Sequence, residues 1–353
     1  MLFEVVGRDE KLVIIIHCPQ ERVRILLSLS YSPFVEAIMP FRQTFFFFLF
    51  LSTSFLFGKS NLTSNINEEE NLSGMDYVDA TIYGIIEGFT EFLPISSTGH
   101  LIITKEFLEE GEDSIQRKEA INAYLIVIQG GAILAVALIY RTRVFSMLLG
   151  ILGMNPQGRR LLVNVIFAFL PAAFLGLLLD ELIENYLFGL LPVAFALFAG
   201  GLFMAWAEKR KKSTELISPN LSNKTLDDLN ISSSLLIGFL QCVAMWPGTS
   251  RSMMTIVGGY LVGLSRVHAA EFSFILGLVT LTAAAGYKCL TKWETMNEHL
   301  SLGPVIFGCL VAGVCAALSV FWLVGYLNRK GLGVFVIYRI LLSFVIFGIF
   351  LST

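Results

Sequence analysis

Long apolar stretches separated by short polar ones dominate the chain from Asp76 onward. A helix needs about 20 predominantly apolar residues to cross a bilayer. Six stretches approach or exceed that length: Ala123–Tyr140, Leu161–Leu179, Leu190–Ala207, Ala270–Tyr287, Pro304–Leu327 and Gly331–Leu351. The pattern predicts an all-α, polytopic membrane protein with about six transmembrane helices.

Two further apolar regions are interrupted by polar residues and a proline, Pro94 in one and Pro247 in the other. Paired broken segments at corresponding positions are typical of inverted repeats with a site near the bilayer midplane. The two prolines align at an offset of 153 residues. We therefore expect two re-entrant helix pairs whose tips meet, formed by Tyr77–Leu93 with Ser96–Leu108 and by Ser234–Trp246 with Met253–Leu264.

Residues 1–74 differ from the rest of the chain. Thr44–Phe57 is apolar but short, follows Arg42, and resembles the h-region of a secretory signal that would start at Met39. The alternative is an uncleaved anchor helix. Asn61–Gly74 is polar and acidic, like a linker. The predicted organisation is a leader with a signal-like segment and linker over 1–74, followed by one membrane-embedded domain over 75–353.

Composition supports the membrane assignment and excludes some partners. Hydrophobic residues make up 55% of the chain and charged residues only 15%, whereas soluble domains carry about 25% charged residues. A net charge of −3 argues against binding to nucleic acid, which requires a basic face. The five cysteines show no metal-binding spacing and are interpreted as small apolar residues.

The placement of lysine and arginine predicts the orientation of the spans, because cytoplasmic loops carry an excess of these residues. Loops on one face are basic (Arg141, Arg143, Arg159, Arg160, Glu208–Lys212, Asn328–Lys330), and loops on the other are acidic (Glu106–Glu119, Asp180–Glu184). With six spans this alternation places both residue 76 and the C-terminus outside the cell.

The first broken segment, EGFTEFLPISSTGH, carries two carboxylates. Glu87 and Glu91 are four residues apart and share one helical face. Ionisable residues within a membrane are costly and are candidates for function. The pair suits a divalent cation such as Mg²⁺ or Ca²⁺, or general acid–base work, although the two residues could instead cap helices near the surface.

Hydroxyl groups and a histidine follow these carboxylates. Ser96, Ser97 and Thr98 precede His100 at the predicted start of a half-helix. Free backbone N–H groups at such a start bind anions. His100 could act as a nucleophile, a general acid or a phosphate anchor.

The second broken segment, PGTSRSMMT, supplies a cation. The planar guanidinium of Arg251 matches phosphate oxygens, and Ser250, Ser252 and Thr255 add hydrogen-bond donors. The alternative is a buried ion pair of Arg251 with Glu87 or Glu91. Together the two segments predict a phosphate site with groups able to cleave the phosphate.

These two motifs, about 150 residues apart, resemble those of the undecaprenyl-diphosphate phosphatases of the bacitracin-resistance type. The likeness runs from about Asp76 to the C-terminus and includes VIQGGAILAV, FLQCVAMW and AEFSF. It implies an enzyme of the bacterial plasma membrane, facing the outer side, that hydrolyses undecaprenyl diphosphate. It also implies dependence on a divalent metal and re-entrant helices. The working residues carried over by position are Glu87, Glu91, Ser96, Ser97, Thr98, His100, Ser250, Arg251 and Thr255.

One position departs from the family pattern: Met253 stands where these enzymes usually have glycine, which puts the local geometry of the second loop in question. A polyprenyl-phosphate flippase or transporter is the main alternative function, because broken helices and midplane charges are also transporter features. A lipid phosphatase of the phosphatidic-acid type is disfavoured, since no histidine follows Arg251 until His268. A homodimer stays an open alternative.

Overall fold

The computed structural model describes residues 2–8, 11–17, 76–108, 115–218 and 223–352. Strands β1 (Leu2–Arg8) and β2 (Lys11–His17) pair antiparallel and belong to a unit separate from the helices. The signal-like segment Thr44–Phe57 and the linker Asn61–Gly74 lie outside the described residues. The division of the chain at residue 74 therefore stays a prediction.

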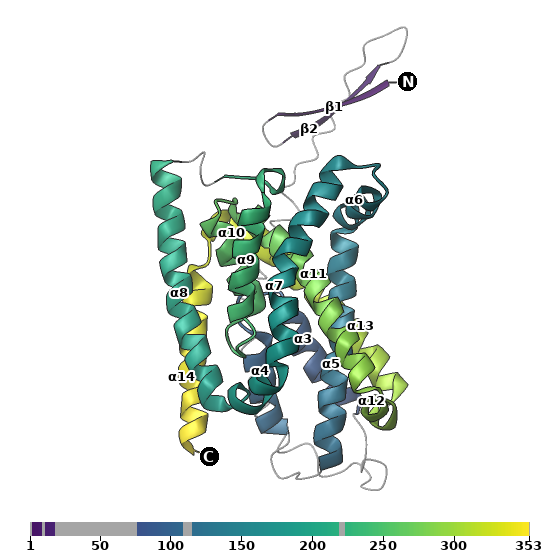
Figure 1. Cartoon of the computed structure of the whole chain (residues 1–353), viewed down its shortest axis with the longest axis vertical. Helices are drawn as coiled ribbons and strands as arrows, with labels where there is room; N and C mark the ends of the chain where they lie inside the picture. Colours follow the sequence, from purple (N-terminus) through teal and green to yellow (C-terminus); the bar gives the residue numbers. More distant parts are fainter. Residues whose placement is uncertain (1, 9–10, 18–75, 109–114, 219–222, 353) are drawn as a thin grey trace. The chain divides into compact units, whose positions relative to one another are not determined.

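Beyond residue 75, the described part of the chain is helical (Figure 1). Its helices are α3 (Tyr77–Thr90), α4 (Ser97–Leu108), α5 (Ile115–Ile139), α6 (Arg141–Ile151), α7 (Pro156–Leu187), α8 (Leu190–Ile217), the 3₁₀ turn η4 (Leu226–Asp228), α9 (Ile231–Val243), α10 (Arg251–Leu261), α11 (Arg266–Thr291), α12 (Trp293–His299), α13 (Leu302–Lys330) and α14 (Gly333–Ser352).

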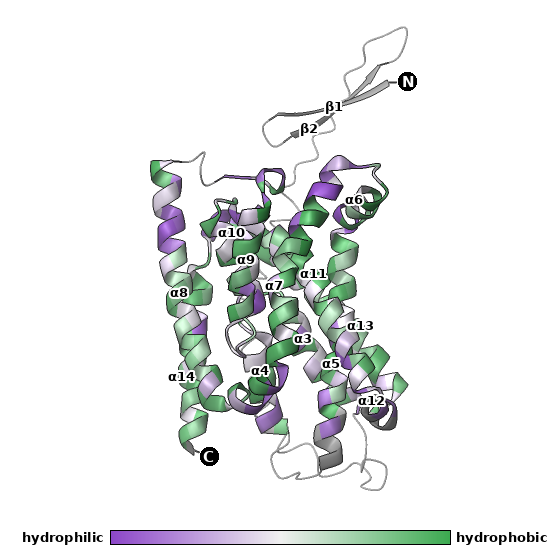
Figure 2. Cartoon of the chain, viewed as in Figure 1, coloured by the Kyte–Doolittle hydropathy of each residue, from purple (hydrophilic) through white to green (hydrophobic). Residues whose placement is uncertain are grey.

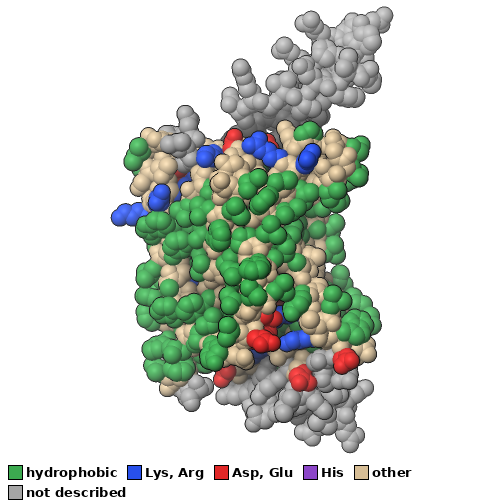
Figure 3. Space-filling view, viewed as in Figure 1, with side chains coloured by type: hydrophobic (Ala, Val, Ile, Leu, Met, Phe, Trp, Pro, Cys, Tyr) green, Lys and Arg blue, Asp and Glu red, His purple; other side chains and the backbone are tan. Residues whose placement is uncertain are grey.

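Six of the described helices are long and apolar enough to cross a membrane: α5, α7, α8, α11, α13 and α14. The predicted six spans are confirmed. Their middle portions are hydrophobic, and polar residues gather at several of their ends, most plainly at the upper end of α8 (Figure 2). Lysine and arginine gather at one end of the helical unit and acidic residues appear towards the other (Figure 3). This separation is the one that the alternating basic and acidic loops predict.

The two broken segments form matching helix pairs, α3 with α4 and α9 with α10. Each pair begins with a side-chain cap, Asp76 on α3 and Asn230 on α9. The second helix of each pair follows a serine with positive φ, 73° at Ser96 and 75° at Ser250. All these features correspond at an offset of 154 residues rather than 153. The proline alignment is therefore one residue out of register.

The order of the spans determines the relative direction of the two pairs. Three candidate spans, α5, α7 and α8, separate α4 from α9. An odd number of crossings brings the chain to the opposite face, so the α9–α10 pair starts from the face opposite to that of the α3–α4 pair. The packing repeats as well. In the two halves α3 corresponds to α9, α7 to α13 and α8 to α14. The contact of α3 with α13 is matched by that of α9 with α7, and α8 packs against its own counterpart, α14. This arrangement is consistent with the predicted inverted repeat.

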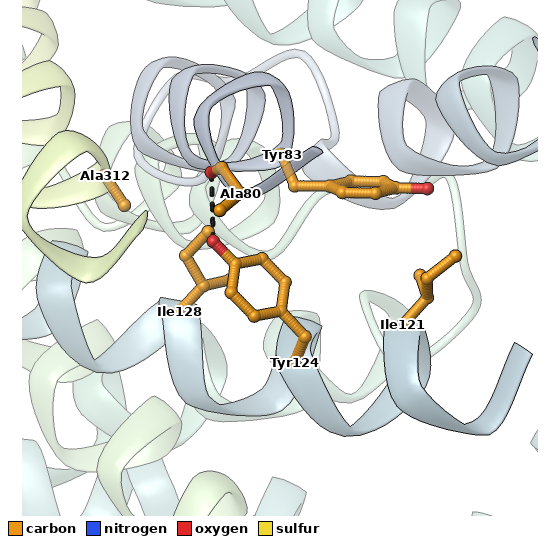
Figure 4. Packing of buried hydrophobic residues seen from close by; sticks show 6 residues of the cluster. All are labelled: Ala80, Tyr83, Ile121, Tyr124, Ile128 and Ala312. Atoms are coloured by element: carbon orange, nitrogen blue, oxygen red, sulfur yellow. Dashed lines mark hydrogen bonds between the residues drawn. The ribbon is translucent and has the colours of Figure 1, made fainter. Parts of the chain in front are cut away.

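Close packing fixes α3, which carries both glutamates. Figure 4 shows the buried residues that pack between α3, α5 and α13. Among them, the hydroxyl of Tyr124 on α5 donates a hydrogen bond of 2.9 Å to the carbonyl of Ala80 on α3. One turn before Glu91, Gly88 has no room for a side chain, since a β-carbon there would lie 2.6 Å from Cβ of Cys315. The backbone that presents Glu91 is thus set directly against α13.

Candidate active site

The two breaks contact each other inside the helical unit. The Ser252 hydroxyl at the start of α10 donates a 2.7 Å hydrogen bond to the carbonyl of Leu93 in the first break. The positive φ of Ser96 and Ser250 turns the chain sharply before α4 and α10, at a cost that non-glycine residues bear mainly at functional sites. The breaks therefore bring the starts of two half-helices together, as the sequence predicts.

An ion pair joins the two halves of the site. Nη2 of Arg251 lies 2.8 Å from Oε1 of Glu91, and the two side chains are only 11% and 6% exposed. The other carboxylate oxygen, Oε2, accepts a hydrogen bond of 2.7 Å from the Ser97 hydroxyl. Of the two glutamates that the sequence offered as partners for Arg251, the structure selects Glu91. Ser97, Glu91 and Arg251 form one connected polar chain.

The remaining surface of the Arg251 guanidinium is held by α11 and by the first break. Nη1 donates to the carbonyl of Ser273 at 3.2 Å. The guanidinium carbon lies 5.4 Å from the centre of the Phe92 ring, within the range of a cation–π interaction. Gly277 of α11 leaves the space that the guanidinium occupies. These contacts hold the cation at the junction of the two breaks.

Glu87 sits one turn earlier on α3 and is 1% exposed. Neither of its carboxylate oxygens has a hydrogen-bond partner within normal geometry, although the Gln129 side chain of α5 is its polar neighbour. A buried carboxylate without partners is costly. It is expected to carry a proton or to face a cation. The alternative of a surface helix cap for Glu87 is wrong, because the residue is buried.

His100 on α4 is held by two hydrogen bonds. Its Nδ1 lies 2.7 Å from the carbonyl of Ser96, which can only accept, so Nδ1 carries a proton. Its Nε2 lies 2.5 Å from the hydroxyl of Tyr338 on α14, and the two rings stack with centroids 5.6 Å apart. In the neutral ring Nε2 is therefore an acceptor. Both nitrogens are engaged, which leaves no free lone pair for attack on phosphorus in this arrangement.

The other predicted hydroxyl residues lie around the same junction. Thr255 and Ser273 hydroxyls are 2.6 Å apart, and Ser250 caps α10 by accepting from the Met253 N–H. Ser96 accepts from the Gly99 N–H at 3.4 Å, and Thr98 lies half-buried in the first turn of α4. All ten predicted site residues thus lie on α3, α4, α10 or the break before α4 or α10.

Tyr338, Ser273 and Phe92 contact the site with their side chains or backbone but are not among the predicted site residues. Tyr338 belongs to the last apolar span, more than 200 residues from the histidine that it contacts. Ser273 lies in the AEFSF run, which the resemblance includes without a role. Phe92 is the residue beside Glu91. Ser273 and Phe92 could have been suspected from the sequence, because both lie inside motif runs of the resemblance. Tyr338 could not, because only the packing of α14 brings it to His100.

The departure from the family pattern at Met253 does not disrupt the second loop. Met253 is fully buried in the first turns of α10, which runs regularly from Arg251 to Leu261. Its N–H still donates a hydrogen bond of 3.3 Å to the hydroxyl of Ser250, which caps the helix. The helix start that presents Arg251 is thus formed with methionine at this position.

The glutamates provide oxygen ligands of the kind that Mg²⁺ and Ca²⁺ prefer. Glu87 fits such an ion, because both of its oxygens are buried and unpartnered. Glu91 is already bound to Arg251 and Ser97, so it would have to share its oxygens. Among the described residues, no group of three or more histidine, cysteine or acidic side chains gathers for a metal. A cation at Glu87 would need further ligands from the substrate or water.

Comparison with known proteins gives a consistent result. The family of the bacitracin resistance protein BacA matches residues 80–345. The undecaprenyl-diphosphatase of Azotobacter vinelandii is 43% identical over 261 residues, which is 74% of this chain and 89% of that relative. Undecaprenyl-diphosphatase 2 of Rhodospirillum rubrum is 41% identical over 269 residues, 76% of this chain and 93% of the relative.

Proposed function

Because the chain belongs to the bacitracin resistance protein BacA family, we propose that it is an undecaprenyl-diphosphatase. It hydrolyses undecaprenyl diphosphate to undecaprenyl phosphate and inorganic phosphate. This reaction regenerates the lipid carrier of cell-wall synthesis and underlies resistance to bacitracin, after which the family is named. The chain is a hydrolase embedded in a membrane by several helices.

The observation that carries this function is the Ser97–Glu91–Arg251 chain at the meeting point of the two breaks. Phosphoryl transfer depends mainly on positioning and on neutralising the charge of the phosphate. Arg251 supplies a guanidinium that matches phosphate oxygens. The starts of α4 and α10 supply backbone N–H groups that have no partners within their helices. A diphosphate placed between the breaks would meet all of these groups.

The geometry favours Ser97 as the nucleophile over His100. The Ser97 hydroxyl already donates to Glu91, which can take its proton as the oxygen attacks the terminal phosphorus. The bond from that phosphorus to the bridging oxygen then breaks, and undecaprenyl phosphate leaves. Water subsequently hydrolyses the phosphoserine. His100, with Nδ1 bonded to Ser96 and Nε2 to Tyr338, is better placed to position or exchange a proton than to attack.

Rapid-quench trapping with substrate labelled in the terminal phosphate tests this step. Labelled Ser97 at early times, and none in Ser97→Ala, is expected. No labelled protein at any time point would exclude the covalent route and leave direct attack by water.

A divalent cation, Mg²⁺ or Ca²⁺, is proposed as the cofactor, with Glu87 and Glu91 as the protein residues that would hold it. Bound there, it would neutralise phosphate charge in addition to Arg251. The unpartnered oxygens of Glu87 are the feature that supports this assignment.

The proposed location is the bacterial plasma membrane, with the active site towards its outer face. The basic end of the helical unit would lie in the cytoplasm, and the opposite end, where acidic residues appear, would lie outside (Figure 3). Undecaprenyl diphosphate is the proposed lipid partner. Assembly into a homodimer remains a prediction that sedimentation in detergent can test.

Phosphate release in detergent distinguishes this enzyme from a transporter. The purified chain, solubilised so that no compartments exist, should release inorganic phosphate from undecaprenyl diphosphate. A flippase would give no net chemical change under these conditions. Absence of phosphate release from folded protein, with Mg²⁺ or Ca²⁺ supplied, would contradict the proposed function.

A further inference from the structure

Arg339 is the largest side chain of the described residues that is completely buried, with 0% exposure in the second turn of α14. Lysine and arginine in membrane helices usually extend to the interface so that their charge stays in water. The burial of Arg339 rules out this arrangement. The charge must therefore be stabilised inside the protein.

The guanidinium is only partly satisfied by the chain. Nη2 donates to the carbonyl of Ala196 on α8 at 3.3 Å and to that of Gly248 in the second break at 3.1 Å. Nε and Nη1 are buried and have no hydrogen-bond partner. No ion pair to Arg339 is present among the residues that the structure describes. Because an arginine side chain stays protonated, this leaves a buried charge that lacks a counter-charge.

The position of Arg339 connects it to the candidate active site. Gly248, which its Nη2 contacts, lies two residues before Ser250 and three before Arg251. Tyr338, its neighbour in α14, holds Nε2 of His100. Arg339 also lies within electrostatic reach of the His100 ring. The unsatisfied cation thus borders the same junction of breaks.

Packing keeps the guanidinium at this place. Gly200 of α8 has no side chain, and a β-carbon there would lie 3.1 Å from Cε of Met253 and 3.2 Å from Cζ of Arg339. The methionine that replaces the usual glycine and the guanidinium are therefore both packed against Gly200. Arg339 has little freedom to move away from the site to reach water.

We propose that Arg339 is a second substrate-binding arginine, whose Nε and Nη1 bind phosphate oxygens of the diphosphate. The free Nε–H and Nη1–H groups lie on different edges of the guanidinium, so each would donate to a different phosphate oxygen. Together with Arg251, Arg339 would supply a second positive charge for a substrate with two phosphates. The inference rests on the proposed function for the identity of the ligand, although the missing counter-charge is independent of it.

Two measurements on purified protein in detergent test the proposal. The first is thermal unfolding with and without inorganic diphosphate, which does not depend on turnover. The second is the kinetics of phosphate release from a polyprenyl diphosphate. The variants are Arg339→Lys, which keeps the charge but loses the fixed N–H donors of the guanidinium, and Arg339→Met, which loses both. Arg141→Met is the control, because Arg141 is exposed at the end of a span.

Inorganic diphosphate should raise the Tm of the wild type and of Arg141→Met by the same amount. The rise in the Tm of Arg339→Met should be less than half of the rise seen in the wild type. Arg339→Lys should raise KM about tenfold, since the ammonium retains the attraction but loses the fixed N–H donors of the guanidinium. If Arg339→Met does not fold, the lysine variant alone decides by its KM and its Tm shift. Equal Tm shifts in wild type and variants, including no shift in any, would overturn the proposal. Wild-type protein that shows the shift but releases no phosphate would contradict the proposed function and not the binding role.

Discussion

The Glu91–Arg251 ion pair makes a quantitative prediction about the cohesion of the two halves of the site. The charged atoms are 2.8 Å apart, and both side chains are almost fully buried. Two unit charges about 4 Å apart interact by about 4 kcal/mol at the effective dielectric constant of partly buried sites. Removing one partner of a buried pair typically costs about 3–5 kcal/mol, because the other charge is left without compensation. Glu91→Gln and Arg251→Met should therefore each destabilise the protein strongly.

The two single substitutions should differ in a defined direction. Without Arg251, the Glu91 carboxylate can take up a proton and become neutral, and it retains the Ser97 hydroxyl. Without the Glu91 charge, the Arg251 guanidinium cannot lose its proton. Glu91→Gln should consequently cost more than Arg251→Met. The double variant should cost less than the sum of the two by about 2–3 kcal/mol, as expected for coupled neighbours.

Equilibrium unfolding in mixed micelles, followed by circular dichroism for all four proteins of the cycle, provides the free energies. Additive costs, within about 0.5 kcal/mol, would show that the two residues do not interact. A larger loss of stability in Arg251→Met than in Glu91→Gln would refute the argument that an unpaired Arg251 guanidinium costs more than an unpaired Glu91 side chain.

Three further predictions concern the histidine, the packing of α3 and the cation. Tyr338→Phe keeps the ring stack on His100 but removes the hydroxyl at Nε2. The loss of one hydrogen bond should lower kcat about tenfold and leave KM within about twofold of the wild-type value. An unchanged kcat in phosphate-release kinetics would contradict the role of the hydroxyl. Gly88→Ala should lower the free energy of unfolding by about 1–3 kcal/mol through overpacking against α13. Gly130→Ala, where a β-carbon meets nothing within 4 Å, is the matched control and should be neutral or slightly stabilising in the same unfolding assay; equal losses in both would refute the packing account. Chelation of divalent cations should abolish phosphate release, and added Mg²⁺ or Ca²⁺ should restore it. The Glu87→Gln variant should need a higher concentration of the metal for the same restoration. Full activity in excess chelator would exclude the cofactor.

The elements that the sequence predicts best are those fixed by hydropathy alone. Runs such as Ala270–Tyr287 are predominantly apolar and long enough to span a bilayer, so length and composition suffice. The polar seven-residue helix α12 has neither property and was not predicted. The two breaks were also predictable, since a proline and ionisable groups interrupt otherwise apolar segments.

The parts of the site that the sequence does not predict depend on long-range packing or on backbone conformation. Tyr338 lies in an apolar run that gives no sign of its contact with His100. Both Glu87 and Glu91 are reasonable partners for Arg251 on composition, and only the junction of the breaks selects Glu91. The correct register of the repeat follows from the positive φ values of Ser96 and Ser250, which leave no mark in residue identity because serine rarely adopts them.

The central claim is that residues from both breaks form one catalytic site. The most direct test is inorganic phosphate release from undecaprenyl diphosphate by purified wild type, Ser97→Ala from the first break and Arg251→Lys from the second, each checked for folding by gel filtration. We expect release by the wild type and a loss of at least about 100-fold in each variant, since each removes a nucleophile or a bidentate phosphate contact. A wild-type rate in either folded variant would contradict the composite site.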